Sequence, residues 1–136
     1  MTIVVDTSIW VEMIRDKSGR VGVAIDRAAQ TQPVLMLAPV RMELLQGCRG
    51  SAQWSAMLAR VSRFVTVHPS EFTWDASARI YFDLRQAGHT IRSVVDCLIA
   101  ALAVEHSLQL LHDDRDFEAI ATVCPLNHHR LELDKA

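Results

Sequence analysis

The chain has 136 residues, of which 50% are hydrophobic and 22% are charged, and its net charge is −2. This length and composition predict one globular domain spanning residues 1–136, and they exclude a disordered chain and a solenoid of repeats. The slightly negative charge argues against a simple basic nucleic-acid-binding protein.

The N-terminus and the cysteines bear on location. The apolar run at residues 3–5 is too short for a signal peptide or a membrane span, so we expect a cytoplasmic protein that does not bind a membrane. Cys48, Cys97 and Cys124 are far apart and form no Cys-x-x-Cys pair. They therefore predict reduced thiols rather than a disulfide framework or a zinc site.

The first half of the chain alternates between strand-like and helix-like patterns. β-branched residues open it and end at an acid, Asp6, after which apolar residues recur at helical spacing. Gly47 and Gly50 interrupt the last of these segments. In chain order we expect a strand over 3–5, a helix over 9–14, a turn at 16–19, a helix over 21–30, a strand over 34–37 and a helix that begins at Pro39.

The second half continues the alternation. Gly88 is typical of the position just after a helix, and Ser93 is a natural N-cap for the next helix, which is apolar nearly all round. We expect helices over 52–63, 74–87, 94–104 and 117–121, strands over 64–67 and 108–111, an acidic turn at 112–116 and a last strand near 131–133.

Short strands that alternate with helices predict parallel pairing through right-handed crossovers. The expected fold class is therefore α/β, a three-layer α/β/α sandwich with a central parallel sheet. In such sheets ligands bind beyond the carboxyl ends of the strands. Asp6 and the acidic turn at 113–116 fall at that edge.

Two acids in the first half of the chain have both functional and structural interpretations. Asp6 follows a β-branched run, so its side chain should project from a strand end, although it also fits the N-cap of the next helix. Glu43 lies in an otherwise apolar helical turn, but a helix can turn one polar face to water. Neither acid decides the function alone.

The acids in the second half are more telling. Asp96 lies in the first turn of the apolar helix, where a buried carboxylate needs a partner, although a capping arrangement with Ser93 also fits. Asp113, Asp114 and Asp116 crowd one turn, and such like charges repel unless water or a cation neutralises them. Hydrogen bonds within the turn are the structural alternative.

Taken together, the acids indicate a metal site. Mg²⁺ and Mn²⁺ choose oxygen ligands, and four or five converging carboxylates suit one or two such ions. Metals of this kind bind a phosphodiester and activate water, so no covalent protein nucleophile is required. Setting the five proposed acids aside leaves a net positive remainder, which weakens the objection from overall charge.

These residues also match a known pattern, and the sequence resembles PIN-domain ribonucleases, most closely the VapC-type toxins. The resemblance covers nearly the whole chain, and the order and spacing of its motifs are more specific than any one of them. The motifs are Val4-Val5-Asp6-Thr7-Ser8-Ile9-Trp10, Glu43 within 40–47, Asp96 within 95–101 and Asp114-Arg115-Asp116-Phe117.

The resemblance implies a Mg²⁺- or Mn²⁺-dependent endoribonuclease acting on structured RNA, such as transfer or ribosomal RNA. It also implies a homodimer and a cognate antitoxin, hence the toxin of a type II toxin–antitoxin system. The implied catalytic residues are Asp6, Glu43, Asp96, Asp114 and Asp116, the implied metal ligands are Asp6, Asp96, Asp116 and Glu43, and Thr7 and Ser8 are supporting polar residues. Whether Asp114 or Asp116 lies closer to the metal stays open, and Asp113 is interpreted as structural.

Three arginines flank the proposed acids in sequence. Arg41, Arg92 and Arg115 are candidate contacts for RNA phosphates, because a guanidinium pairs with phosphate oxygens through two donors. Solvated or ion-paired arginines are the alternative interpretation of each.

Three other functions remain as alternatives. One is a PIN nuclease that processes RNA without a toxin role. Another is an aspartate-dependent phosphatase of the haloacid dehalogenase type, but that family expects a second acid two residues after the first, where this chain has Ser8. The third is a non-catalytic binding module in which the acids merely cap helices, against which stand the carboxylates at all the matching positions.

Overall fold

The structure, a computed structural model, describes residues 1–131. Short strands alternate with helices, as the sequence predicts. Within these residues the strands are β1 (Ile3–Val5), β2 (Val34–Leu37), β3 (Thr66–Val67), β4 (Gln109–His112) and β5 (His128–Arg130). The helices are α1 (Thr7–Arg15), α2 (Arg20–Thr31), α3 (Ala38–Gln46), α4 (Ser51–Val61), α5 (Glu71–Gln86), α6 (Val94–Glu105) and α7 (Arg115–Ile120).

The strands form one sheet in the order β3-β2-β1-β4-β5, and every neighbouring pair is parallel. β1 is the central strand, and Ile3, Val4 and Val5 are all buried, which explains its unbroken β-branched run. Val5 pairs with Leu111, so β1 and β4 end side by side. The residues that follow these two strands therefore meet at one edge of the sheet.

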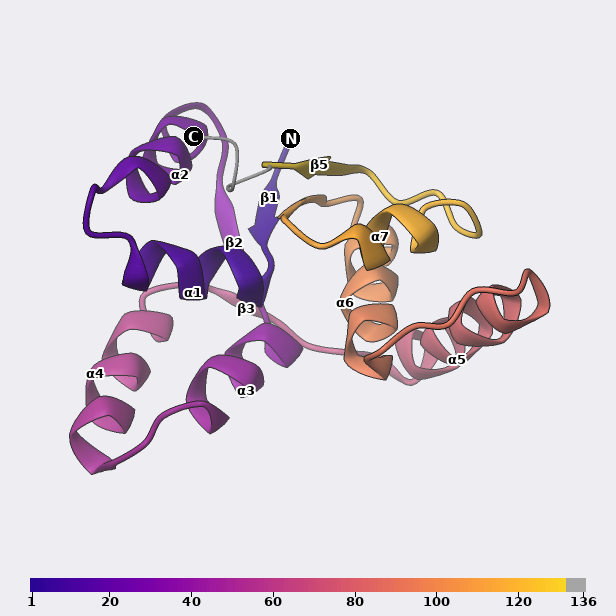
Figure 1. The fold of residues 1–136 in the computed structure, drawn as a ribbon, viewed down its shortest axis with the longest axis horizontal. Coiled ribbons are helices and arrows are strands. Elements are labelled where there is room, and N and C mark those ends of the chain that lie inside the picture. Colours follow the sequence, from indigo (N-terminus) through magenta and orange to yellow (C-terminus); the bar gives the residue numbers. More distant parts are fainter. Residues whose placement is uncertain (132–136) are drawn as a thin grey trace.

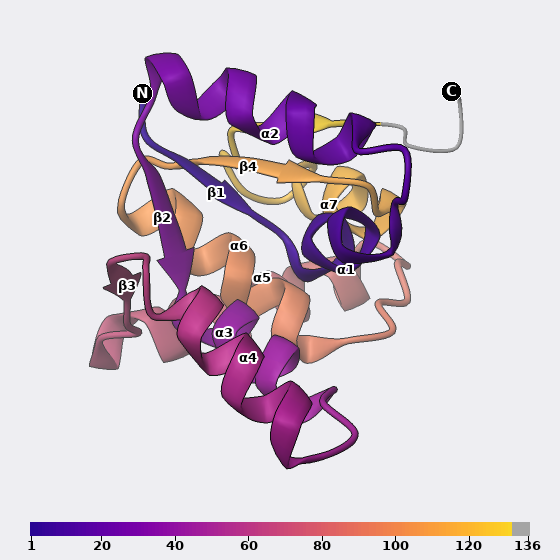
Figure 2. The same ribbon diagram turned by 90° about the vertical axis from the view of Figure 1, so that its left-hand side faces the viewer.

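Helices cover both faces of the sheet. α1 and α2 lie on one side, and α5, α6 and α7 lie on the other (Figure 1). The view turned by 90° agrees, with α1 and α2 in front of the strands and α6 behind them (Figure 2). The predicted three-layer α/β sandwich with a central parallel sheet is confirmed.

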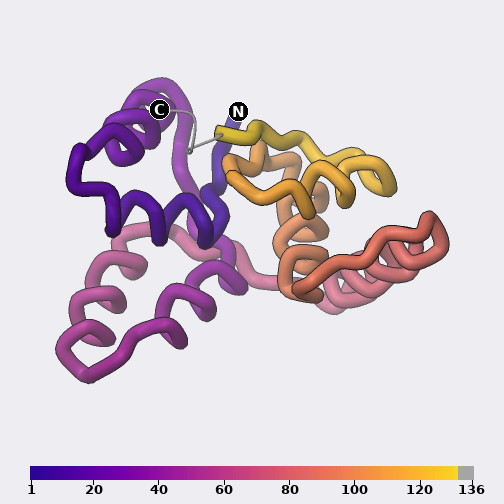
Figure 3. The backbone as a smooth tube through the Cα atoms, in the orientation of Figure 1, coloured from indigo at the N-terminus to yellow at the C-terminus, as the bar shows by residue number. Residues whose placement is uncertain are grey.

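Two helices extend the structure beyond the sheet. After β2 the chain forms α3 and then turns back through α4 before it reaches β3 (Figure 3). α3 packs against α1, α4 and α6, so it is tied to both sides of the sheet. This placement brings Glu43 on α3 toward the strand ends.

α6 is the most deeply buried helix in the described part of the chain. Nearly all of its side chains are apolar and packed, as the sequence predicts, and Ser93 is its N-cap. None of the helices within residues 1–131 is long and apolar enough to span a membrane. Cys48, Cys97 and Cys124 are free thiols, as expected from their spacing.

Several predicted boundaries are wrong. The last strand within residues 1–131 is β5 at His128–Arg130. Of the strand predicted near 131–133, Leu131 follows β5 without belonging to it, and positions 132 and 133 lie outside the described residues. α5 begins at Glu71 rather than at residue 74, because the Ser70 and Thr73 side chains form a capping box at its start. The strand predicted over 64–67 is shortened to β3, and α7 begins at Arg115 rather than at 117.

Candidate active site

Asp6 directly follows β1 and is the N-cap of α1. Its Oδ2 accepts hydrogen bonds from the Ser8 amide at 3.2 Å and from the Ser8 hydroxyl at 2.6 Å. Asp6 is only 4% exposed, and burial raises the pKa of its carboxyl above the ordinary value, against the lowering effect of the Ser8 hydrogen bonds. The two interpretations of Asp6, as a helix cap and as a site residue, are compatible, because its carboxylate caps α1 and also lines a cleft.

Glu43 reaches the same cleft from α3. Its Oε1 accepts a hydrogen bond of 2.7 Å from the Thr7 hydroxyl. Thr7 and Ser8 thus each hold one of the predicted acids: Ser8 binds Asp6, and Thr7 binds Glu43. Their role as supporting residues of a functional site stays a prediction.

Asp96 lies in the first turn of α6 and is 8% exposed. Ser93 caps this helix by accepting from the Val95 amide, so the Asp96 side chain is not needed for the cap. No hydrogen bond joins the Asp96 carboxylate to another residue of the described chain. Burial, followed by repulsion from neighbouring carboxylates of which Asp6 is the strongest, raises its pKa to about 7. A carboxylate in this state favours a cation as its partner.

Asp114 and Asp116 complete the cluster from the start of α7. Asp114 is the N-cap of this short helix, and its Oδ1 accepts from the Asp116 amide at 2.9 Å. Asp96, Asp114 and Asp116 each offer a carboxylate oxygen within 4.8 Å of the others. Asp116 Oδ2 is buried and has no hydrogen-bond partner in the described structure.

These acids surround one small cleft. Its volume is about 300 Å³, and its lining residues are Asp6, Thr7, Ser8, Glu43, Arg92, Ser93, Asp96, Asp114 and Asp116. All five carboxylates predicted to form the site therefore converge, although they come from four different places along the chain.

One of the three predicted arginines lines the cleft. Arg92 Nε lies 3.5 Å from Asp116 Oδ2, and one of its terminal nitrogens lies 3.7 Å from Asp114 Oδ1. Its side chain is 76% exposed, so these ion-pair contacts are long, screened by solvent and weak. Arg41 and Arg115 do not line the cleft. For these two arginines a direct role beside the acids has no support in the geometry.

Asp113 points to a different partner. Its Oδ1 accepts from Arg130 Nε at 3.0 Å, and a terminal nitrogen of Arg130 contacts Glu118 at 3.0 Å. The ion pair links the turn after β4 to the end of β5. It fits the structural role expected for Asp113, which does not line the cleft.

A contact between a buried and a half-buried histidine lies beside the acidic turn, and reasoning from the sequence missed it. His112, the last residue of β4, is fully buried, and its Nε2 lies 2.9 Å from His128 Nδ1 on β5. Burial, reinforced by His128, lowers the pKa of His112 to about 4, so its ring is neutral near pH 7. The pairing of β4 with β5 would have revealed the contact, but no strand was predicted over residues 128–130.

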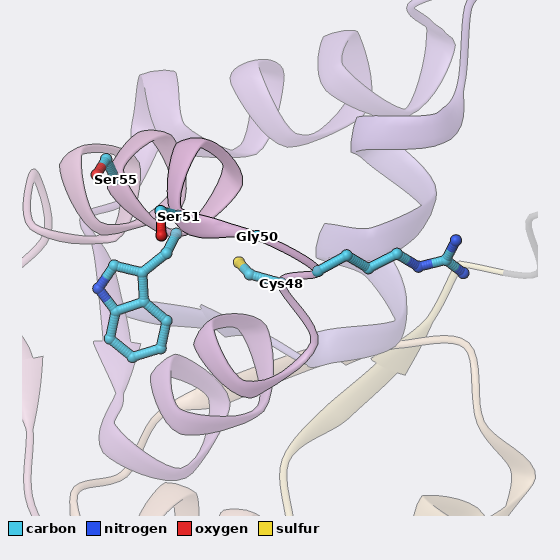
Figure 4. A pocket seen from close by; sticks show the side chains of 6 residues that line it. Cys48, Gly50, Ser51 and Ser55 are labelled. Carbon is cyan, nitrogen blue, oxygen red and sulfur yellow. The ribbon is translucent and has the colours of Figure 1, made fainter.

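A second hollow, of about 410 Å³, lies where α3 gives way to α4 (Figure 4). Cys48 and Gly50 lie in the connecting segment, and Ser51 and Ser55 lie on α4. The described residues that line it include no carboxylate, so it offers no anionic oxygen ligand for a hard cation.

The cleft, by contrast, suits a divalent cation. Mg²⁺ binds oxygen at about 2.1 Å, so two direct ligands of one ion lie at most about 4.2 Å apart. The three carboxylate oxygens lie within 4.8 Å of one another, so at most a small side-chain movement or a retained water is needed for them to share one ion. Asp116 Oδ2, which has no hydrogen-bond partner, and the raised pKa of Asp96 both indicate charge that such an ion would neutralise.

Comparisons with known proteins agree with one another. The sequence profile of the PIN domain family matches residues 3–123. Ribonuclease VapC11 of Mycobacterium tuberculosis is 34% identical over 127 residues, which cover 91% of this chain and 95% of that protein. Among solved structures, VapBC2 from Rickettsia felis, bound to a promoter DNA fragment, has a TM-score of 0.78 at 21% identity and covers 96% of this chain and 98% of its own. DNA-bound VapBC from Salmonella typhimurium has a TM-score of 0.77 at 18% identity, with the same two coverages.

Proposed function

The chain belongs to the PIN domain family, and from that premise we propose that it is a divalent-metal-dependent endoribonuclease that hydrolyses phosphodiester bonds in structured RNA. The observation that carries this proposal is the convergence of Asp96, Asp114 and Asp116, with Asp116 Oδ2 buried, without a hydrogen-bond partner and in only a loose contact of 3.5 Å with the exposed Arg92. A capping role explains Asp114 but leaves the other two carboxylates without a purpose.

The acids divide into two groups. Asp96, Asp114 and Asp116 are proposed to bind one Mg²⁺ or Mn²⁺ ion directly. Asp114 and Asp116 of the acidic turn are then both metal ligands. Asp6 and Glu43 are held by Ser8 and Thr7, so we assign them to the same ion through water or to a second ion.

A bound divalent cation would supply a Lewis acid for the phosphodiester and would lower the pKa of water. The protein's part is to fix the acids before substrate arrives. Helix caps and buried strand ends hold Asp6 and Asp114, and packing of α6 holds Asp96. Arg92, which is exposed beside Asp114 and Asp116, is placed to receive an RNA phosphate.

We further propose that the protein is the toxin of a toxin–antitoxin pair, that it works as a homodimer and that residues 1–136 are one domain. The support is its similarity to a VapC ribonuclease along 91% of the chain and its fold-level likeness to VapBC complexes. Transfer or ribosomal RNA as substrate and a cytoplasmic location stay predictions.

A cleavage assay tests the function. Purified full-length protein is incubated with folded transfer RNA and ribosomal RNA fragments in Mg²⁺, in Mn²⁺ or in EDTA. We expect cleavage with either metal and none with the chelator. The Asp96→Asn variant should be inactive, whereas the matched control Asp75→Asn, at an exposed position on α5, should cleave normally. Equal cleavage in EDTA, or hydrolysis of p-nitrophenyl phosphate instead of RNA, would overturn the proposal.

The toxin role needs a second assay. Induced expression in a bacterial host should arrest growth, and Asp96→Asn should not. If the protein cleaves RNA in vitro without arresting growth, the nuclease assignment stands and the toxin assignment fails, which favours an RNA-processing role.

A further inference from the structure

His112 is a fully buried polar residue placed two residues before the carboxylate cluster. It ends β4, and its ring packs against the buried Phe117, with ring centroids 5.0 Å apart. It does not line the cleft, so it lies outside the proposed metal site. An imidazole in such a place loses its hydration, and this cost is recovered only through hydrogen bonds.

Both ring nitrogens of His112 are engaged. Nδ1 accepts a hydrogen bond of 3.1 Å from the Asp114 amide, so Nδ1 carries no proton. The ring proton therefore sits on Nε2, which donates to His128 Nδ1 at 2.9 Å. The two contacts fix the tautomer of His112 and the orientation of its ring.

The bond to Asp114 acts at a critical point of the backbone. Asp114 is extended, with φ −140° and ψ 119°, and its side chain in turn holds the Asp116 amide. A continuous series of hydrogen bonds thus runs from His128 through His112 and the Asp114 backbone to Asp116. The direction in which both carboxylates leave the turn depends on this series.

We propose that His112, oriented by His128, is a positioning residue that holds the turn from Asp114 to Asp116 in its metal-binding geometry. The inference rests on the proposed function, since it concerns the same site. Partners of this kind, one step removed from a metal, typically change metal affinity by about 10- to 100-fold when they are removed.

The test compares leucine and asparagine at both histidines. At each position Nδ1 is the accepting atom, and the Oδ1 of asparagine can take its place, whereas leucine cannot accept. The variants are His112→Leu, His112→Asn, His128→Leu and His128→Asn. His129→Leu is the matched control, because His129 is the exposed neighbour on β5. Mn²⁺ binding is measured by calorimetry on the full chain, and thermal unfolding in EDTA reports on folding.

We expect His112→Leu and His128→Leu to weaken Mn²⁺ binding, by about tenfold or more for His112→Leu. Each asparagine variant should recover most of that loss, and His129→Leu should bind as the wild type does. A loss of packing alone would lower the melting temperature of leucine and asparagine variants without this difference in Mn²⁺ affinity. If His112→Leu does not fold, the two His128 variants, at a half-buried position, carry the same comparison.

Two results would overturn the inference. One is Mn²⁺ affinity in the leucine variants equal to that of the wild type, and the other is equal loss in leucine and asparagine variants. Both leave the proposed function intact if the wild type binds Mn²⁺ and cleaves RNA. A wild type that binds no Mn²⁺ refutes the proposed function itself, and the inference falls with it.

Discussion

The Thr7 hydroxyl donates a hydrogen bond of 2.7 Å to Glu43 Oε1, and this contact joins α1 to α3 beside the acidic cleft. Thr7 immediately follows Asp6, which comes directly after β1. The end of β1 therefore presents Asp6 and, through Thr7, also binds Glu43, which lies 36 residues after Thr7. The position of Glu43 therefore depends on α1 as well as on its own helix.

Removing the Thr7 hydroxyl should weaken metal binding without abolishing it. We expect Thr7→Val, which keeps the side-chain shape, to reduce Mn²⁺ affinity and RNA cleavage by about tenfold, because Glu43 loses its donor. Calorimetry and initial cleavage rates measure the effect. Thr31→Val, at the exposed end of α2, is the matched control. Equal behaviour of the two variants would show that Glu43 needs no such support.

Asp96→Asn should separate function from stability. The ionised carboxylate is buried among other acids, so its replacement by a neutral amide removes repulsion and should stabilise the metal-free protein by about 1 kcal/mol. Cleavage should fall by about 100-fold or more, because the cation loses a ligand. Thermal melts in EDTA and cleavage assays provide the two measurements. A lower melting temperature would instead indicate that Asp96 supports the fold.

The raised pKa of Asp96, about 7, makes a pH dependence predictable. In the unfolded chain this carboxyl titrates near 3.8, so between that pH and about 7 the folded state holds a proton that the unfolded state has lost. Stability due to Asp96 therefore falls as pH rises through this window. The lowered pKa of His112 has the opposite effect on the pH dependence of stability. The effect of Asp96 is therefore measured as the difference between the variant and the wild type. The melting temperature of Asp96→Asn relative to the wild type, both in EDTA, should increase from pH 5 to pH 8.

Arg92→Ala should act on RNA rather than on the metal. Loss of one phosphate contact is expected to raise KM and to reduce the salt dependence of RNA binding by about one unit of slope. Mn²⁺ affinity should be kept or increased, since the guanidinium beside Asp114 and Asp116 competes with a cation. Arg79→Ala, on α5, is the control. Reduced Mn²⁺ affinity in Arg92→Ala would assign the arginine to site assembly instead.

The sequence was informative where periodicity and burial coincide. The β-branched run before Asp6 and the apolar helix that holds Asp96 predicted β1 and α6, because burial on all sides leaves an unbroken apolar pattern. The rule that ligands bind beyond the strand ends placed Asp6 and the acidic turn at one edge of the sheet. The parallel pairing of the strands was predicted from the alternation of strands and helices along the chain. Position along the chain and the family resemblance predicted which acids form the site, but not that Ser8 binds Asp6 and Thr7 binds Glu43.

The errors have physical causes too. β5 carries His128, His129 and Arg130, which is a polar stretch that shows no strand pattern and pairs only because β4 offers its edge. The start of α5 was placed too late because its first residues are defined by the Ser70 capping box rather than by apolar spacing. The His112–His128 contact joins two strands that are separate in the sequence, so no local sequence pattern predicts it.

The most direct test of the site is the position of a bound ion. Crystals of the full-length protein soaked in Mn²⁺ would be examined by anomalous diffraction at the manganese edge. We predict an anomalous peak within bonding distance of the carboxylates of Asp96, Asp114 and Asp116, and its loss in Asp96→Asn crystals. A peak elsewhere, or no peak in wild-type crystals whose cleft is open to solvent, would contradict the assignment of these carboxylates as the metal site.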